Sequence, residues 1–207
     1  MSGAPTAGLP RQIAGAPASA RDDRFDVAVP TTEQRSIAAG WLLLGVAALI
    51  GAGVFSILLV LARTPFFANL VPAGDFFRVA LVVHVDLSVL VWFVSMAGML
   101  WTIDTSPRSL WLGWLALWVT GLGTLFMAVA PFTGAATPVM SNYVPVLDND
   151  TFLYGLAVFG VGFLLLTLRS FVAPARMSLQ LDGADALRFG LKAAAVSSAV
   201  ALMALTR

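Results

Sequence analysis

The sequence predicts an all-α, polytopic membrane helix bundle with about five transmembrane helices. Hydrophobic residues make up 59% of the 207 residues and charged residues only 11%, and the mean hydropathy is +0.89. An ordinary soluble domain does not have so few charges for its surface. The apolar residues form long runs without alternation, which favours helices over a β-barrel. Cysteine is absent, which excludes disulfides, thiolate metal sites and iron–sulfur clusters.

The chain divides into a polar tail and an apolar region. Residues 1–35 are rich in Ala, Gly, Pro, Arg and Asp, and we expect them to form a disordered cytoplasmic tail. Thr31 and Gln34 have the spacing of a capping box, which predicts a helix start near Thr31. Residues 36–207 are expected to form the transmembrane domain. Its predicted spans are about 37–62, 77–101, 110–130, 151–172 and 187–205.

The first and third spans have features that suit helix packing and a membrane interface. Gly45, Gly51 and Gly53 lie in the first span, where small residues let a neighbouring helix or a flat cofactor approach the backbone closely. Simple helix packing is the favoured interpretation. The third span has three tryptophans towards its start, which is typical of an interfacial belt: Trp111, Trp114 and Trp118.

The later connections and the fifth span are more polar. The longest loop between spans is 131–150, and its Asp148-Asn149-Asp150 run is expected to be a solvated turn rather than a Ca²⁺ site. The fifth span has Arg188 and Lys192 near its start and many alanines. Such a helix is poorly suited to face lipid on all sides, so we expect further helices to pack against it.

The distribution of Lys and Arg predicts the orientation. With the N-terminus in the cytoplasm, nine of the twelve basic residues fall on or near the cytoplasmic side: Arg11, Arg21, Arg24, Arg35, Arg108, Arg169, Arg176, Arg188 and Lys192. Only Arg63, Arg78 and Arg207 fall outside. The second span then runs inwards, and His84 lies roughly 10 Å below its outer end at 1.5 Å per residue. We expect a multi-pass protein of the bacterial inner membrane.

Two ionisable residues, His84 and Asp86, lie inside the second span, and His84 is the only histidine in the chain. Ionisable groups in a span usually face a protein interior and mark a site. On a regular helix at 100° per residue His84 shares a face with Ser88, Val91, Ser95 and, less closely, Gly98, which form a narrow stripe of polar and small residues. Asp86 is about 200° away, so the two cannot bind one metal. Two interpretations of His84 stay open: a hydrogen-bonded core imidazole and an axial haem ligand. Asp86 is a structural polar site or part of a proton relay.

The second span also resembles a known family. Arg78, then His84-Val85-Asp86-Leu87, then Val91-Trp92 and Ala97-Gly98, resembles the second helix of the haem–copper oxidase catalytic subunit, closest to its nitric oxide reductase branch. In that family this histidine is an axial ligand of the low-spin haem. The resemblance is strong over about 25 residues and loose over 36–172. Asp86 stands where the reductase branch tends to carry Asn.

The resemblance implies an oxidoreductase of a respiratory chain, with this chain as one of its membrane subunits, such as half of a split subunit, or as the N-terminal portion of a longer subunit. His84, Ser88, Gly51 and Arg78 are its expected cofactor-binding residues, around a low-spin haem b or haem a whose iron His84 ligates. One histidine leaves the second axial position to another chain or region, cannot hold copper, and makes the chain alone catalytically incomplete. Expected partners are other membrane subunits or the C-terminal half of the subunit, the lipid bilayer and a cytochrome or quinol electron donor, but not nucleic acid. The alternative is a non-enzymatic membrane subunit or assembly partner.

Overall fold

The computed structural model describes residues 30–65, 76–134, 136–139, 145–174 and 183–205. The predicted tail, except for its last residues, lies outside this part of the chain. The described elements follow in this order: α1 (Thr32–Ala62), α3 (Phe76–Val85), the π-helix η1 (Asp86–Val91), α4 (Trp92–Asp104), α5 (Leu110–Val129), the 3₁₀-helix η2 (Ala130–Phe132), β1 (Thr137–Val139), β2 (Val146–Asp148), α6 (Asp150–Val172) and α7 (Gly183–Leu205).

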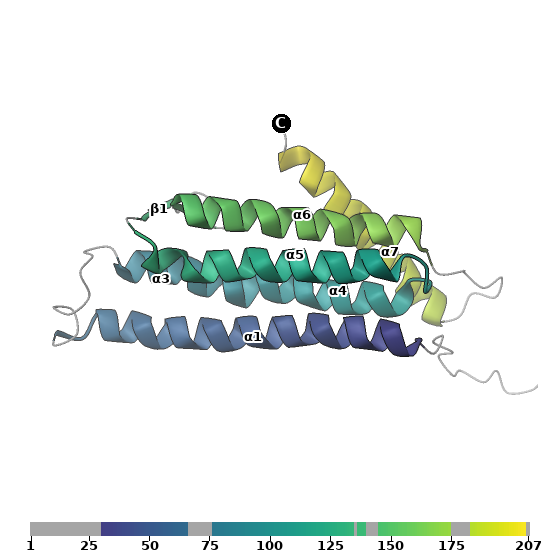
Figure 1. Ribbon diagram of the computed structural model, residues 1–207, viewed down its shortest axis with the longest axis horizontal. Helices are drawn as coiled ribbons and strands as arrows, with labels where there is room; N and C mark the ends of the chain where they lie inside the picture. Colours follow the sequence, from purple (N-terminus) through teal and green to yellow (C-terminus); the bar gives the residue numbers. More distant parts are fainter. Residues whose placement is uncertain (1–29, 66–75, 135, 140–144, 175–182, 206–207) are drawn as a thin grey trace, which may run out of the picture.

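The described residues contain the five long apolar helical segments that the sequence predicts. α3, η1 and α4 form one continuous segment, Phe76–Asp104, which stands with α1, α5, α6 and α7 as long and apolar enough to cross a membrane. α1, the α3–η1–α4 segment, α5 and α6 lie side by side along the long axis of the molecule, and α7 crosses them at an angle (Figure 1). The all-α bundle is thus confirmed.

The start of α1 is fixed by the capping box that the sequence predicts. The backbone N–H of Gln34 donates to Thr31 Oγ1 over 3.2 Å, and the backbone N–H of Thr31 donates to Gln34 Oε1 over 3.0 Å. The Gln34 side chain also donates from Nε2 to the carbonyl oxygens of Thr102 and Thr105, at 3.2 and 2.6 Å. The same residue therefore begins α1 and ties this end to the last turn of α4.

At the other end, the loop 131–150 has structure that the sequence does not predict. β1 and β2 pair as an antiparallel hairpin, with Pro138 opposite Leu147. Asn149 is then the N-cap of α6, because its Oδ1 accepts from the backbone N–H of Phe152 over 3.1 Å. Leu147 and Phe152 are both fully buried, so the hairpin closes this end of the bundle over the core.

α5 and α6 approach each other closely through glycine. A Cβ placed on Gly123 of α5 would lie 2.7 Å from the carbonyl oxygen of Gly155, and one on Gly155 would lie 2.8 Å from the backbone nitrogen of Met127. Gly162 of α6 is in similar contact with Thr120. Backbones packed this closely leave no room for a side chain, as expected where small residues form a helix–helix interface.

Candidate functional site

His84 is held by the first helix. Its Nδ1 lies 2.8 Å from the carbonyl oxygen of Ala52 in α1. A carbonyl oxygen only accepts hydrogen bonds, so Nδ1 carries the proton and donates. The ring is half-buried, whereas Ala52 is 3% exposed. α1 therefore fixes both the orientation of the imidazole and its tautomer.

The other ring nitrogen, Nε2, is left as an acceptor. A neutral imidazole with the proton on Nδ1 has its free lone pair on Nε2. In the described part of the chain Nε2 makes no hydrogen bond. Histidines that bind metals almost always donate from the nitrogen that is not coordinated, often to a backbone carbonyl, which fixes the ring and raises its basicity as a ligand. The bond to Ala52 thus prepares Nε2 for a metal or a proton donor.

The helix that carries His84 is not regular, and the assumption of 100° per residue along the whole span is wrong. Asp86–Val91 form a π-helix between α3 and α4. A π-turn inserts about one extra residue and is frequent at functional sites. Positions before and after it therefore differ in rotation from what a continuous α-helix would give. The calculated 100° stripe from His84 to Gly98 does not describe this helix.

Several residues of that stripe nevertheless lie against α1. A Cβ on Gly45 would be 3.1 Å from Ser95 Cβ, and one on Gly98 would clash with the ring of Trp41. Ser95 and Trp41 are fully buried. Small residues on α4 and α1 therefore interlock towards one end of this interface, while His84 bonds α1 nearer the other end. The polar-and-small face is a packing surface along most of its length.

Asp86 is the first residue of the π-helix and is 1% exposed. Neither of its carboxylate oxygens has a hydrogen-bond partner among the described residues. A buried ionised carboxylate without a partner is strongly unfavourable, so such a group stays protonated or receives a partner. Of the two ionisable side chains in this span, only His84 makes a hydrogen bond among the described residues.

The other predicted site residues do not surround His84 as a pocket. Ser88 Oγ donates to the carbonyl oxygen of His84 over 2.7 Å, so its hydroxyl bonds its own helix rather than a ligand. Gly51 faces Leu87, since a Cβ there would lie 3.2 Å from Leu87 Cδ1. Arg78 is exposed in the first turn of α3, about 9 Å along the helix axis before His84.

The surface of α1 is open at Gly53, the residue that follows Ala52. A Cβ on Gly53 would meet nothing within 4 Å. Gly53 also lines an open groove of about 370 Å³ together with Ser56, Ile57 and Val60. The groove is lined by residues of α1 alone, and His84 is not among them. The sequence supplies one imidazole ligand for a haem iron, because His84 is its only histidine.

Other metals find less support. Among the described residues, no three His, Asp or Glu side chains lie close enough together to hold a metal ion. Asp86 and His84 supply one carboxylate and one imidazole. Coordination of copper or zinc by protein ligands alone requires more donors than this pair.

Arg169 is a buried charged residue. The sequence predicts only that it lies on or near the cytoplasmic side, as one of nine basic residues there. It lies in the last turn of α6, is 0% exposed, and none of its three guanidinium nitrogens has a hydrogen-bond partner in the part of the chain that the structure describes. The side chain runs between helices: Cβ atoms built on Gly113 would lie 3.2 Å from its Nε and 3.3 Å from Ile37 Cδ1. Nothing in the sequence distinguishes it from an arginine at a membrane surface, because a position near the end of an apolar run suits both.

Comparison with known proteins gives relatives without an assigned function. "Uncharacterized protein RP382" of Rickettsia prowazekii (strain Madrid E) is 34% identical over 158 residues, which are 65% of this chain and 31% of that protein. An "Uncharacterized protein" of Aquifex aeolicus (strain VF5) is 30% identical over 129 residues, 62% of this chain and 32% of that protein. The chain thus spans about a third of the length of these curated relatives. No protein-family model and no solved structure matches.

Proposed function

We propose that this chain is an integral membrane part of a haem–copper oxidase-like protein, in which His84 Nε2 is one axial ligand of a low-spin haem b or haem a. The observation that carries the proposal is the bond from His84 Nδ1 to the Ala52 carbonyl oxygen, 2.8 Å long. It fixes the tautomer that leaves Nε2 unprotonated, which is the arrangement found at metal-binding histidines. The family resemblance names the same residue.

The haem would supply electron transfer, and the residues of this chain would hold and orient it. α1 keeps the imidazole in place through the carbonyl oxygen of Ala52. The second axial ligand and the site of oxygen or nitric oxide reduction belong to a region outside this chain. The greater length of the curated relatives offers room for such a region.

The membrane placement is part of the same proposal. The five apolar segments would cross a bacterial inner membrane with the N-terminus inside, as the nine-to-three division of basic residues indicates. α7 would then begin near the cytoplasmic surface. Reporter fusions after Pro107 should be cytoplasmic and fusions after Thr133 external, and the reverse pattern would contradict the orientation.

A non-enzymatic membrane subunit is the second candidate. The observation in its favour is the close packing of α4 on α1, where Gly98 meets the ring of Trp41 and Ser95 meets Gly45. In that case the bond from His84 to Ala52 only ties α3 to α1. The two candidates predict different effects of added imidazole on a variant without the His84 side chain. Imidazole can replace a haem ligand, but a non-enzymatic subunit has no haem signal to restore.

The test is a spectrum of the complete protein with its native partners. His84→Gly should remove the low-spin signal from the reduced-minus-oxidised spectrum, and added imidazole should restore it by taking the vacant axial position. Val89→Ala, an exposed position on the same helix, should leave the spectrum unchanged. A full low-spin signal in His84→Gly that has assembled correctly, judged by size-exclusion chromatography, would reject the haem ligand.

A further inference from the structure

The buried side chains of α7 lie in the part of the helix that ends at Ala195, and most of its other described side chains are exposed. Of its described side chains, only Asp185 and Ala195 are buried. Arg188 connects this first part to α4, since its Nε lies 3.4 Å from Asp104 Oδ1 and its NH1 lies 3.2 Å from Asp185 Oδ1. Further along, α7 leaves the bundle at an angle to α6 (Figure 1). The helices therefore form a wedge that opens away from the ion pairs.

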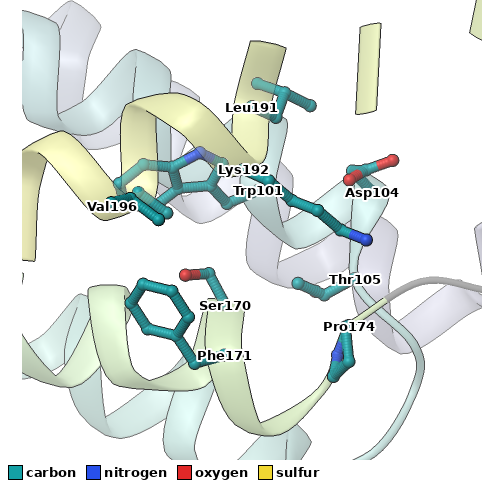
Figure 2. A pocket seen from close by; sticks show the side chains of 10 residues that line it. Trp101, Asp104, Thr105, Ser170, Phe171, Pro174, Leu191, Lys192 and Val196 are labelled. Atoms are coloured by element: carbon teal, nitrogen blue, oxygen red, sulfur yellow. The ribbon is translucent and has the colours of Figure 1, made fainter. Parts of the chain in front are cut away.

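A pocket of about 290 Å³ lies in this wedge, between α4, α6 and α7. Figure 2 shows that its lining is divided: Trp101, Phe171 and Val196 lie towards one end, and Asp104 and Lys192 lie at the other. Ser170 lies beside Phe171. A pocket with an apolar end and a charged end suits an amphipathic ligand.

The charged end carries both signs. Asp104, Asp185, Arg188 and Lys192 gather there, two negative and two positive groups. Arg188 engages Oδ1 of Asp104 and of Asp185, whereas Lys192 makes no ion pair within 4 Å among the described residues. A purely anionic ligand gains no net attraction from four charges that sum to zero. A ligand that has its own cation and anion can meet Asp104 and Lys192 at once.

The charged end indicates the kind of occupant. A neighbouring transmembrane helix would offer mostly apolar side chains to this face and would leave Lys192 without a counter-charge. A phospholipid offers an acyl chain to the apolar end and a charged headgroup to the other end. Pockets between transmembrane helices on the cytoplasmic side bind lipid headgroups.

We propose that this pocket binds one phospholipid with a primary ammonium headgroup, a phosphatidylethanolamine. Lys192 binds the phosphate, Asp104 accepts from the ammonium, and an acyl chain lies against Phe171 and Val196. Ethanolamine has N–H donors that a choline headgroup lacks, and a phosphatidylglycerol headgroup has no cation for Asp104. The inference rests on the membrane placement proposed above, but not on haem.

The experiment uses the full chain in nanodiscs that contain equal amounts of phosphatidylethanolamine, phosphatidylglycerol and phosphatidylcholine. After release into mild detergent, native mass spectrometry counts the lipids retained. Phosphatidylethanolamine should be retained above the other two. Lys192→Gln should reduce this retention about tenfold, since a charge-assisted hydrogen bond is lost. Arg63→Gln, at the opposite end of the bundle, is the matched control.

Val196→Trp is the second variant, because it fills the apolar end and leaves the charged end intact. It should also reduce retention, and thermal midpoints show whether each variant folds. Equal retention of the three lipids, a preference for phosphatidylglycerol, or an unchanged count in folded Lys192→Gln would overturn the proposal. A chain that enters no nanodisc contradicts the membrane placement itself, which distinguishes the two failures.

Discussion

The α5–α6 pair and α7 are both apolar helices, but they pack in opposite ways. α5 and α6 meet backbone to backbone, with a Cβ on Gly123 falling 2.7 Å from the Gly155 carbonyl oxygen. On α7, a Cβ on Gly190 would meet nothing within 4 Å. Both regions contain small residues and long apolar runs. A small residue therefore brings helices together only where another helix lies against it, as α6 does at Gly123.

The sharpest way to break the α5–α6 contact is a single methyl group. Gly123→Ala should lower the free energy of unfolding by about 3 kcal/mol, since the new Cβ meets backbone atoms of Gly155 and Phe159 that cannot move aside. Thermal unfolding of the chain in detergent measures the effect.

The matched controls make the same change where there is space. Gly160→Ala in α6 and Gly190→Ala in α7 add a Cβ that meets nothing within 4 Å. Each should raise the free energy of unfolding by about 0.5–1 kcal/mol, because alanine favours a helix. A comparable loss at all three positions would show that the close approach of α5 and α6 does not exist.

The two regions also differ in their buried cations. Arg169 of α6 is 0% exposed, and its guanidinium has no hydrogen-bond partner within the described segments, whereas Arg188 of α7 pairs with Asp104 and Asp185. In the isolated chain, Arg169→Met should raise the free energy of unfolding by about 2 kcal/mol, because it removes an uncompensated buried charge. Arg188→Met should lower it by about 1 kcal/mol.

Guanidinium unfolding would confuse these charge changes with salt effects, so urea or SDS titration is the better measurement. If Arg169→Met lowers the stability instead, the guanidinium has a counter-charge in the isolated chain. The contrast between the two arginines would then disappear.

The smallest effect is expected at an exposed position in the second half of α7. Val200 is 55% exposed, and Val200→Ala in the isolated chain should change the free energy of unfolding by less than about 0.5 kcal/mol. The same substitution in the complete protein should cost more if another helix covers this face. A loss above about 1 kcal/mol in the isolated chain would mean that α7 already packs along its whole length.

The positions of the helices could be predicted from the sequence, because hydropathy depends only on which side chains are present. Five apolar segments and the capping box of Thr31 and Gln34 follow from residue types and spacing alone. The hairpin of β1 and β2 did not, since its strands have three residues each and leave no periodic pattern. The burial of Arg169 in the last turn of α6 was not predictable either, because it depends on how the neighbouring helices pack.

The candidate site was predictable in its residue but not in its geometry. His84 stands out as the only histidine inside an apolar run. Its partner is the backbone carbonyl of Ala52, and any residue type could have offered such a group. The glycine expected beside the histidine, Gly51, faces Leu87 instead. Contacts to the main chain of another helix are set by how the helices pack. No pattern of residue types in a single sequence predicts them.

The π-helix at Asp86–Val91 also governs how relatives should be aligned. One residue of an α-helix corresponds to about 100° of rotation, so deleting a residue in this segment would turn His84 by that angle relative to Gly98. The histidine would leave Ala52 while Gly98 kept its place against Trp41. A one-residue gap at this place in an alignment therefore means that the histidine of the relative faces a different neighbouring helix. It is not a neutral loss of length.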